Sequence, residues 1–177
     1  MMMNRHGMTL LKPSNSIVVR LLNRKMRRSE TVYLLDTDVL TLFFRYPGQQ
    51  PLLQQRILST PAENLFISII SVEETTQGAL ELVKRDHLKD GGVRGYRLLH
   101  NMMTDFKTLE ICPFTSEASV IHKNMSAATK RIGRNDCKIA AIALSKGFTV
   151  ITRNVEDYRA IPNVMFEDWT REEIVRR

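Results

Sequence analysis

Cysteine is scarce in this chain of 177 residues. Only Cys112 and Cys137 occur, and they do not form a Cys-x-x-Cys pair. A disulfide framework is therefore excluded, and the usage is typical of a reducing, cytoplasmic compartment. The four histidines are scattered without the spacing of a zinc site. No apolar run approaches the roughly 20 residues of a membrane helix, so we expect no membrane association.

Several motifs of common enzyme classes are also missing. The chain has no Gly-x-x-x-x-Gly-Lys phosphate loop, no Gly-x-Gly-x-x-Gly turn and no Gly-x-Ser-x-Gly elbow. These absences argue against phosphate-loop nucleotide hydrolases, dinucleotide-binding enzymes and serine hydrolases of the elbow type.

Acidic residues are absent from the first 29 residues, which carry seven lysines and arginines. Residues 30–177 hold 19 basic and 19 acidic residues, so the net charge of +7 resides entirely in this N-terminal arm. We expect residues 1–30 to be a disordered arm. It has three alternative explanations: a start codon assigned too early, a targeting segment or a nucleic-acid-binding tail. Residues 31–170 are long enough for one domain, followed by a short tail at 171–177.

Strand-like and helical segments alternate along the domain. Short apolar runs predict strands at 32–35, 65–70, 109–112, 148–152 and 164–166. Helical spacing predicts helices at 38–45, 51–58, 71–83, 93–109, 116–131, 135–146 and 154–160. This alternation indicates an α/β fold, in which a parallel sheet is flanked by helices on both faces.

Four acidic or amide side chains stand just beyond apolar runs or at the start of the following helices. They are Asp36, Glu74, Asp136 and Asn154. Because the carboxyl ends of parallel strands meet at one edge, we expect these side chains to converge there. Several carboxylates at one point are costly unless a cation lies between them, and oxygen ligands favour Mg²⁺ or Mn²⁺. The pattern therefore favours a metal-dependent phosphoester hydrolase.

Each of these residues also has a purely structural explanation. Asp36 is a suitable helix N-cap, and Ser71-x-x-Glu74 has the spacing of a capping box. Asp136, after a possible N-cap at Asn135, would complement a helix dipole, and Asn154 would cap a short turn. The joint placement of four such residues, rather than any one of them, indicates a site.

Basic residues stand close in sequence to these positions and are candidates for neutralising a phosphodiester. They are Arg45, Arg134 and Arg153. Asp157, three residues after Asn154, is able to occupy the same space as that amide or to remain a solvated surface acid.

The chain resembles PIN-domain ribonucleases, especially the VapC-type toxins of bacterial toxin–antitoxin pairs. The similar segments span residues 32–169 in the order of the family. They are Tyr33-Leu34-Leu35-Asp36-Thr37-Asp38, Ile67-Ser68-x-x-Ser71-x-x-Glu74, Ile132-Gly133-x-x-Asp136-x-x-Ile139, Val150-Ile151-Thr152-Arg153-Asn154-x-x-Asp157-Tyr158 and Phe166-Glu167-Asp168-Trp169.

The resemblance implies a three-layer PIN-like fold with four to five strands and a Mg²⁺ or Mn²⁺ centre. Asp36, Glu74 and Asp136 correspond to the acids of that centre, and it selects Glu74 over the neighbouring Glu73. The fourth position is Asn154, with Asp157 as a further candidate ligand. Thr152 is expected to hydrogen-bond the carboxylates or a water.

The resemblance also implies the activity and the partners. It implies hydrolysis of RNA phosphodiester bonds, a cognate antitoxin that blocks the cleft, and a homodimer. Two alternatives stay open. One is an RNA-binding PIN-like domain with impaired chemistry, to which the amide at Asn154 points. The other is a haloacid-dehalogenase-type phosphatase, in which Asp36 is the nucleophile and Asp38 the general acid.

Overall fold

The computed structural model describes residues 31–46, 48–173, 175 and 176 of the chain. The predictions for the arm at 1–30 lie outside the described residues. The strands are β1 (Tyr33–Leu35), β2 (Leu65–Ser68), β3 (Glu110–Cys112), β4 (Thr149–Ile151), β5 (Met165–Asp168) and β6 (Val175–Arg176). The helices are α2 (Thr37–Arg45), α3 (Pro51–Ser59), α4 (Ile69–Asp90), α5 (Val93–Asp105), α6 (Ser116–Asn124), α7 (Ala127–Lys130), α8 (Arg134–Lys146) and α9 (Val155–Arg159), with short 3₁₀ turns η1 (Ala62–Asn64) and η2 (Phe106–Thr108).

The strands form one sheet in the order β3-β2-β1-β4-β5-β6. The first five strands of this order are parallel, and only β6 runs antiparallel to its neighbour β5. The predicted α/β fold with a parallel sheet is confirmed, although the sheet of the described residues has six strands rather than four to five. The sixth is the two-residue β6 beside the chain end, which is too short to be recognised from an apolar pattern.

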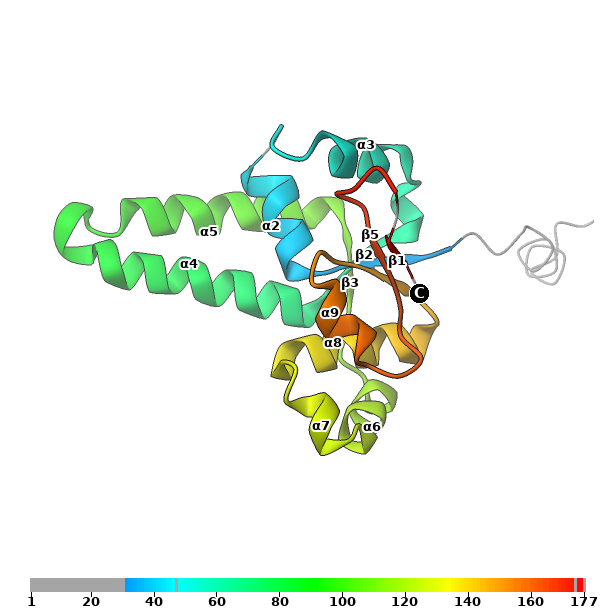
Figure 1. The fold of residues 1–177 in the computed structure, drawn as a ribbon. Coiled ribbons are helices and arrows are strands. Elements are labelled where there is room, and N and C mark those ends of the chain that lie inside the picture. The colour runs from blue at the N-terminus through cyan, green and yellow to red at the C-terminus, as the bar shows by residue number, and fades with distance from the viewer. Residues whose placement is uncertain (1–30, 47, 174, 177) are drawn as a thin grey trace, which may run out of the picture. The chain divides into compact units, whose positions relative to one another are not determined.

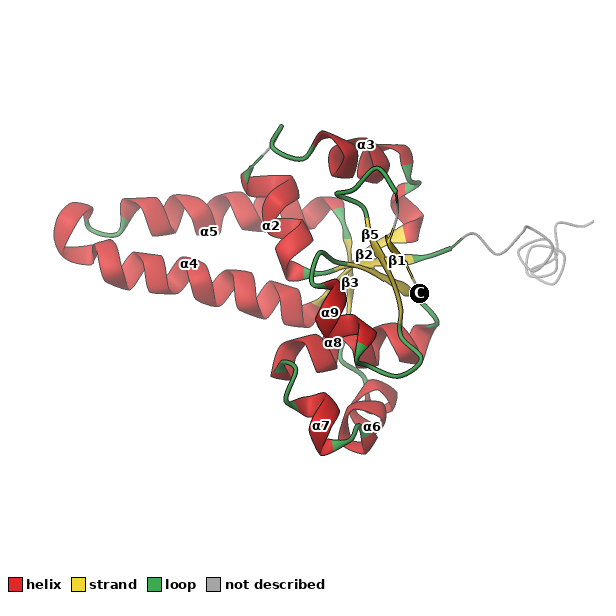
Figure 2. Cartoon of the chain, viewed as in Figure 1, coloured by secondary structure: helices red, strands yellow, loops and turns green. Residues whose placement is uncertain are grey.

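Helices cover both faces of the sheet, as Figures 1 and 2 show, with α2 and α3 on one side and α6, α7 and α8 on the other. Successive residues of one strand point to opposite faces. Leu34 accordingly packs with the helix residues Ile139 and Tyr158, whereas Leu35 packs with Val39 and Leu53 on the opposite face. Burial on both faces explains why the strands are continuous apolar runs.

Some predicted element boundaries are wrong. Helix α4 begins at Ile69, and its N-cap is Ser68, whose hydroxyl accepts the backbone N–H of Ser71. Ser71 is therefore not a cap, and the predicted Ser71-x-x-Glu74 capping box is wrong. The N-cap of helix α8 is Gly133, two residues earlier than the predicted cap at Asn135. The predicted helix at 116–131 is divided into α6 and α7.

Helices α4 and α5 form a long antiparallel hairpin that projects from the sheet (Figure 1). Its turn uses Gly91 and Gly92, both at positive φ. Gly95 lies so close to the backbone of Val83 that a Cβ atom there would overlap it, so the two helices meet tightly near the turn. No helix in the described part of the chain is both long and apolar enough for a bilayer crossing.

The direction of chain winding changes beside β1. The chain passes from β1 to β2 and β3 on one side, and then crosses to β4 on the other side of β1. Ligands of open α/β sheets bind at such a point, beyond the carboxyl ends of the two strands. The residues that follow β1 and β4 are Asp36 and Thr152.

Candidate active site

Asp36 occupies the carboxyl end of β1 and is also the N-cap of α2. One carboxylate oxygen accepts the N–H of Thr37 at 2.7 Å, and the other accepts the hydroxyl of Thr152 at 2.8 Å. The side chain is 4% exposed. The capping explanation raised by the sequence is thus correct for Asp36, but the cap uses only one of its two oxygens.

Glu74 lies on the second turn of α4 and is held from two other elements. The hydroxyl of Thr37 donates to its Oε2 at 2.5 Å, and the amide of Asn135 donates to its Oε1 at 2.8 Å. The neighbouring Glu73 is exposed. Glu74 is therefore turned toward Asp36 and the start of α8, and Asn135 serves as a hydrogen-bond donor to Glu74 rather than as a helix cap.

Asp136 projects from the first turn of α8. Gly133 lies directly beside it, and a Cβ atom at that glycine would overlap Oδ2 of Asp136. Burial raises the pKa of Asp136, and the neighbouring charges of Glu74, Asp157 and Asp38 raise it further. These electrostatic neighbours place Asp136 among the other carboxylates.

Asp38 belongs to the same group, although the sequence suggested it only as part of a phosphatase site. Its Oδ2 accepts hydrogen bonds from the backbone N–H and the Nε of Arg153, at 3.3 and 3.2 Å. Its Oδ1 is buried and has no hydrogen-bond partner. The available signal was its position two residues after Asp36, in the first turn of the helix that follows β1.

These side chains surround one hollow of about 500 Å³ at the carboxyl edge of the sheet. Its lining residues are Asp36, Thr37, Asp38, Thr41, Leu42, Tyr46, Glu74, Asp136, Arg153 and Asn154. A second hollow, of about 410 Å³, shares Glu74 and Asp136 with it and extends over Glu73, Gly133, Arg134, Asn135 and Lys138. The structure therefore brings together the acids expected from the sequence, with Arg153 and Arg134 beside them.

The hollow of 500 Å³ has a large excess of negative charge. Four carboxylates line it, and Arg153 is its one lysine or arginine among the described residues. Burial, with the charges of Asp38 and Asp136, raises the pKa of Asp36 to about 8. Burial also raises the pKa of Asp38, although Arg153 opposes this change. Such raised values are typical of carboxylates that are buried next to one another.

The donor set fits a hard divalent ion. All of its acidic ligands are oxygens, and the buried Oδ1 of Asp38 has no partner. In the described part of the chain, however, no three histidine, cysteine, aspartate or glutamate side chains are already grouped as a metal site. Hydrogen bonds hold the carboxylates of Asp36 and Glu74 in place in the lining of the hollow.

Other predicted site residues lie around or away from this hollow. Asn154 reaches it, and its amide donates to Asp157 at 2.6 Å. Asp157 does not line the hollow, but its charge raises the pKa of Asp136. Arg45 lies elsewhere, in a hollow of about 560 Å³ between α2 and α5, where its Nη2 is 3.9 Å from the sulfur of Met102.

Tyr158 is a buried neighbour that the sequence did not suggest as a site residue. Its side chain belongs to the core beneath α8, and its hydroxyl makes no hydrogen bond. Burial and the charges of Asp36 and Asp136 raise the pKa of Tyr158 well above its ordinary value. The phenol is therefore neutral and is close enough to Asp36 and Asp136 to be affected by their charges.

Comparisons with known proteins agree with this arrangement. A PIN domain family model matches residues 33–162. Ribonuclease VapC1 of Haemophilus influenzae strain R2866 is 25% identical over 146 residues, which cover 79% of this chain and 99% of that protein. Ribonuclease VapC2 of Rickettsia felis is 28% identical over 67 residues, 36% of this chain and 50% of that protein.

Solved structures share the fold. The structure of FitAB bound to an IR36 DNA fragment has a TM-score of 0.63 at 25% identity, covering 80% of this chain and 98% of that one. The VapBC2 complex of Rickettsia felis bound to promoter DNA has a TM-score of 0.62 at 21% identity, covering 78% and 99%. The family model spans most of the chain and includes each of the four carboxylates of the hollow. This chain belongs to the PIN domain family.

Proposed function

We propose that this protein is an endoribonuclease that hydrolyses RNA phosphodiester bonds with the help of Mg²⁺ or Mn²⁺. The observation that carries the proposal is the position of Asp36, Asp38, Glu74 and Asp136 around one hollow at the carboxyl edge of a PIN fold. The name of the VapC1 relative, a ribonuclease that matches along almost its whole length, supports RNA as the substrate.

Asp36 and Asp136 would hold the ion directly, with Glu74 facing them across the hollow. A divalent ion supplies Lewis-acid chemistry there, because it makes water more acidic and polarises the scissile phosphate. Thr152 fixes the direction of the Asp36 carboxylate. Thr37 and Asn135 fix that of Glu74, which would accept the proton of the attacking water.

Cationic side chains would hold the substrate at the two hollows. Arg153 lies at the mouth of the first and Arg134 lines the second, so both are able to meet phosphate oxygens on either side of the scissile bond. Arg45 lines the neighbouring hollow between α2 and α5, which shares Thr41 and Tyr46 with the first, and its role in binding the substrate stays a prediction.

We also propose that the protein is a toxin held inactive by a cognate antitoxin and that it acts in the cytoplasm. One solved neighbour is described as a toxin–antitoxin complex from Klebsiella pneumoniae, with a TM-score of 0.54 and 22% identity. Another, VapBC-5 of Mycobacterium tuberculosis, is described as a member of the VapBC family of toxin–antitoxin systems. The homodimer expected from the resemblance stays a prediction.

The test is cleavage of a mixed tRNA and mRNA pool by the purified full-length chain in Mg²⁺ or Mn²⁺. Parallel reactions contain EDTA, or the Asp36→Asn or Asp136→Asn variant. We expect discrete products that disappear in all three controls. Intact RNA with a folded protein would favour the impaired RNA-binding domain, whereas hydrolysis of small phosphomonoesters would favour the phosphatase alternative.

A further inference from the structure

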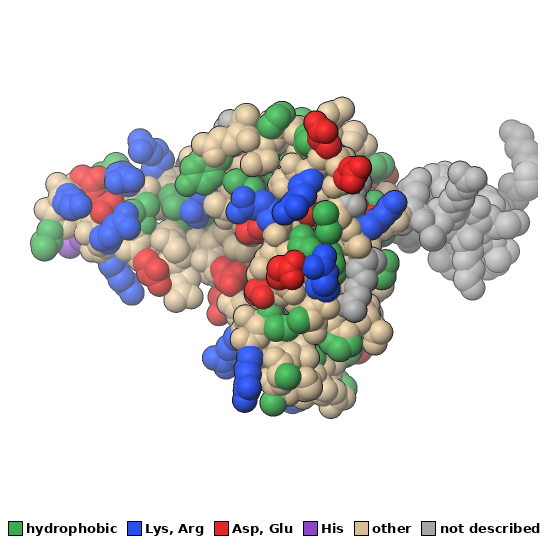
Figure 3. Space-filling model, viewed as in Figure 1, with side chains coloured by type: hydrophobic (Ala, Val, Ile, Leu, Met, Phe, Trp, Pro, Cys, Tyr) green, Lys and Arg blue, Asp and Glu red, His purple; other side chains and the backbone are tan. Residues whose placement is uncertain are grey.

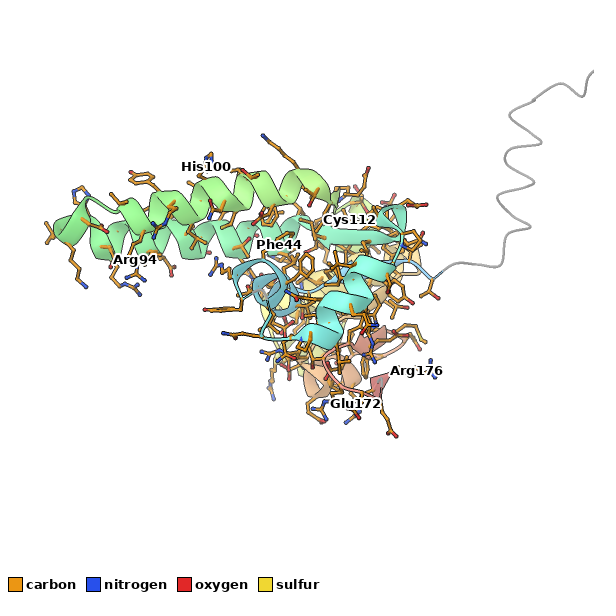
Figure 4. The ribbon with its side chains drawn as sticks, turned by 90° about the horizontal axis from the view of Figure 1, so that it is seen from above. Phe44, Arg94, His100, Cys112, Glu172 and Arg176 are labelled. Atoms are coloured by element: carbon orange, nitrogen blue, oxygen red, sulfur yellow. The ribbon has the colours of Figure 1, made fainter. Side chains whose placement is uncertain are left out.

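The far end of the α4–α5 hairpin is basic, although the domain as a whole is neutral. Between residues 84 and 97 there are five lysines or arginines and two aspartates, a net charge of +3. The five are Lys84, Arg85, Lys89, Arg94 and Arg97. Figure 3 shows blue side chains gathered over this end of the hairpin, and Figure 4 shows Arg94 near the turn and His100 farther along α5. We call these five residues the hairpin cations.

Both acids of this segment are occupied within the hairpin. Asp86 is 2% exposed, and its carboxylate pairs with Arg85 at 3.3 Å and Arg94 at 3.5 Å, with Lys89 at 4.0 Å. Asp90 accepts the backbone N–H groups of Gly92 and Val93 at 2.9 and 3.2 Å. The field that this end presents to solvent is therefore dominated by cations.

The cations themselves face outward. The side chains of Arg85, Lys89 and Arg94 are 68%, 76% and 62% exposed in spite of their pairing with Asp86. Tyr96 is 58% exposed among them. An exposed aromatic ring among cations is the combination on which unpaired nucleic-acid bases stack while their phosphates are neutralised.

The hairpin is a rigid support for this surface. The close approach of Gly95 to Val83 leaves no room for a side chain between the helices, and the Asp86 pairs join α4 to α5. Arg85 follows Glu74 by 11 residues on α4, which at about 100° per residue returns to nearly the same face of the helix. Lys89 is 15 residues beyond Glu74, or about 22 Å along the axis at about 1.5 Å per residue.

Without a bound metal ion the active-site hollow disfavours RNA, because four carboxyl groups line it and Arg153 is the one lysine or arginine in its described lining. Affinity for a polyanion must then come from cations outside it. We propose that the hairpin cations bind phosphates of the RNA substrate several nucleotides away from the cleaved bond. This inference rests on the proposed ribonuclease function and assigns the hairpin as its substrate-binding arm.

Binding is measured in EDTA, so that no cleavage is needed, by fluorescence anisotropy of labelled total tRNA across a range of salt concentrations. The test variant carries Lys84→Gln, Arg85→Gln and Lys89→Gln. Its matched control removes the same charge elsewhere, with Lys107→Gln, Lys123→Gln and Arg131→Gln, all at exposed positions. Residues 1–30 are retained in every protein, so their contribution is constant.

We expect the test variant to bind tRNA at least tenfold more weakly at low salt. The negative slope of log K against log salt should become shallower by about 2, because each lost phosphate contact removes about 0.7–0.9 from its magnitude. The control triple should keep the wild-type slope. Lys89→Glu alone, which leaves the closer Arg85 and Arg94 on Asp86, should weaken binding in the same direction, and thermal melting verifies that each variant is folded.

Equal slopes for the two triples would overturn the proposal. So would hairpin-dependent binding of poly-glutamate that exceeds the binding of tRNA, because the surface would then suit an acidic protein. The outcome is separable from the proposed activity. If the test variant cleaves RNA in Mn²⁺ with the same salt dependence as the wild type, the role of the hairpin is contradicted but the ribonuclease function is not. If the wild type does not cleave RNA, the ribonuclease function is contradicted, but the binding measured in EDTA still tests the hairpin.

Discussion

The hydroxyl of Thr152 donates a hydrogen bond to the carboxylate of Asp36 at 2.8 Å, and 116 residues of sequence separate the two. Both side chains are buried, and the bond joins the ends of β4 and β1 where the winding of the sheet changes direction. The same hydroxyl accepts the backbone N–H of Asn154 at 3.0 Å. Thr152 therefore fixes both the orientation of Asp36 and the start of the loop that carries Asn154.

We expect Thr152→Val to lower kcat for RNA cleavage by roughly 10- to 100-fold, since a hydrogen bond to a charged group contributes about 1.5–3 kcal/mol. Without this donor the pKa of Asp36 rises further, so the acidic limb of the rate–pH profile should move to higher pH. Thr152→Ser retains the hydroxyl and should retain the profile. A valine variant with an unshifted profile would show that the bond does not act on Asp36.

The pKa of Asp36, raised to about 8, predicts a pH-dependent stability in the absence of metal. Between about pH 4 and pH 8 the folded protein holds a proton that the unfolded chain has lost, so the free energy of unfolding falls as the pH rises through this range. The loss should be on the order of a few kcal/mol. Urea denaturation in EDTA at several pH values measures it.

Asp36→Asn is the control for that measurement, because an amide has no proton to lose. Its stability in EDTA should be higher than that of the wild type at pH 8 and should depend less on pH. If the two proteins have parallel stability–pH curves, Asp36 is not the group responsible.

Divalent ions should stabilise the folded protein if the carboxylates hold them. We expect millimolar Mn²⁺ to raise the Tm of the wild type by a few degrees at pH 8 and by less at pH 5.5, where protons compete for Asp36 and Asp136. Asp36→Asn and Asp136→Asn should lose most of the rise. A shift of equal size in the wild type and both variants would place the bound ion elsewhere.

Neighbouring glutamates on α4 offer a matched pair. Glu74→Gln replaces the oxygen that accepts the amide of Asn135 or the hydroxyl of Thr37, and we expect cleavage to fall by about 100-fold. Glu73 carries the same charge as Glu74 on the same turn of the helix, but its side chain is exposed. The Glu73→Gln variant should therefore cleave RNA at a rate within about twofold of the wild type. Equal losses in both variants would indicate a general charge effect.

Substitutions of two glycines, Gly133 beside the site and Gly78 away from it, should have different effects on activity and stability. Gly133→Ala would force its Cβ against Oδ2 of Asp136, so we expect most of the cleavage activity to be lost even where the protein remains folded. At Gly78, in the middle of α4, a Cβ has nothing within 4 Å, so Gly78→Ala should leave activity unchanged and stabilise the protein by about 0.5–1 kcal/mol. Assays of activity and thermal melting on both variants compare the two effects.

Periodicity predicted most of the elements but not their ends. The strands β1 and β4 are apolar runs because they are buried on both faces, which made them recognisable. The 65–70 run was divided because Ser68 caps a helix there, so Ile69 and Ile70 belong to α4. Ile69 is exposed and Ile70 is buried, yet both are apolar and β-branched, so local apolar character alone did not distinguish the last strand residues from the first helix residues.

The sequence by itself determined the fold class and identified Asp36 as the acid that follows β1, because buried strands must be apolar and a charged residue after one must emerge at its end. Tertiary structure decided the rest. It aligned Asn135 and Thr37 with Glu74, brought Asp38 to Arg153, and moved Arg45 to another hollow. These relationships depend on strand order and helix rotation, which result from packing over the whole domain. They therefore cannot be predicted from the local pattern of apolar and polar residues.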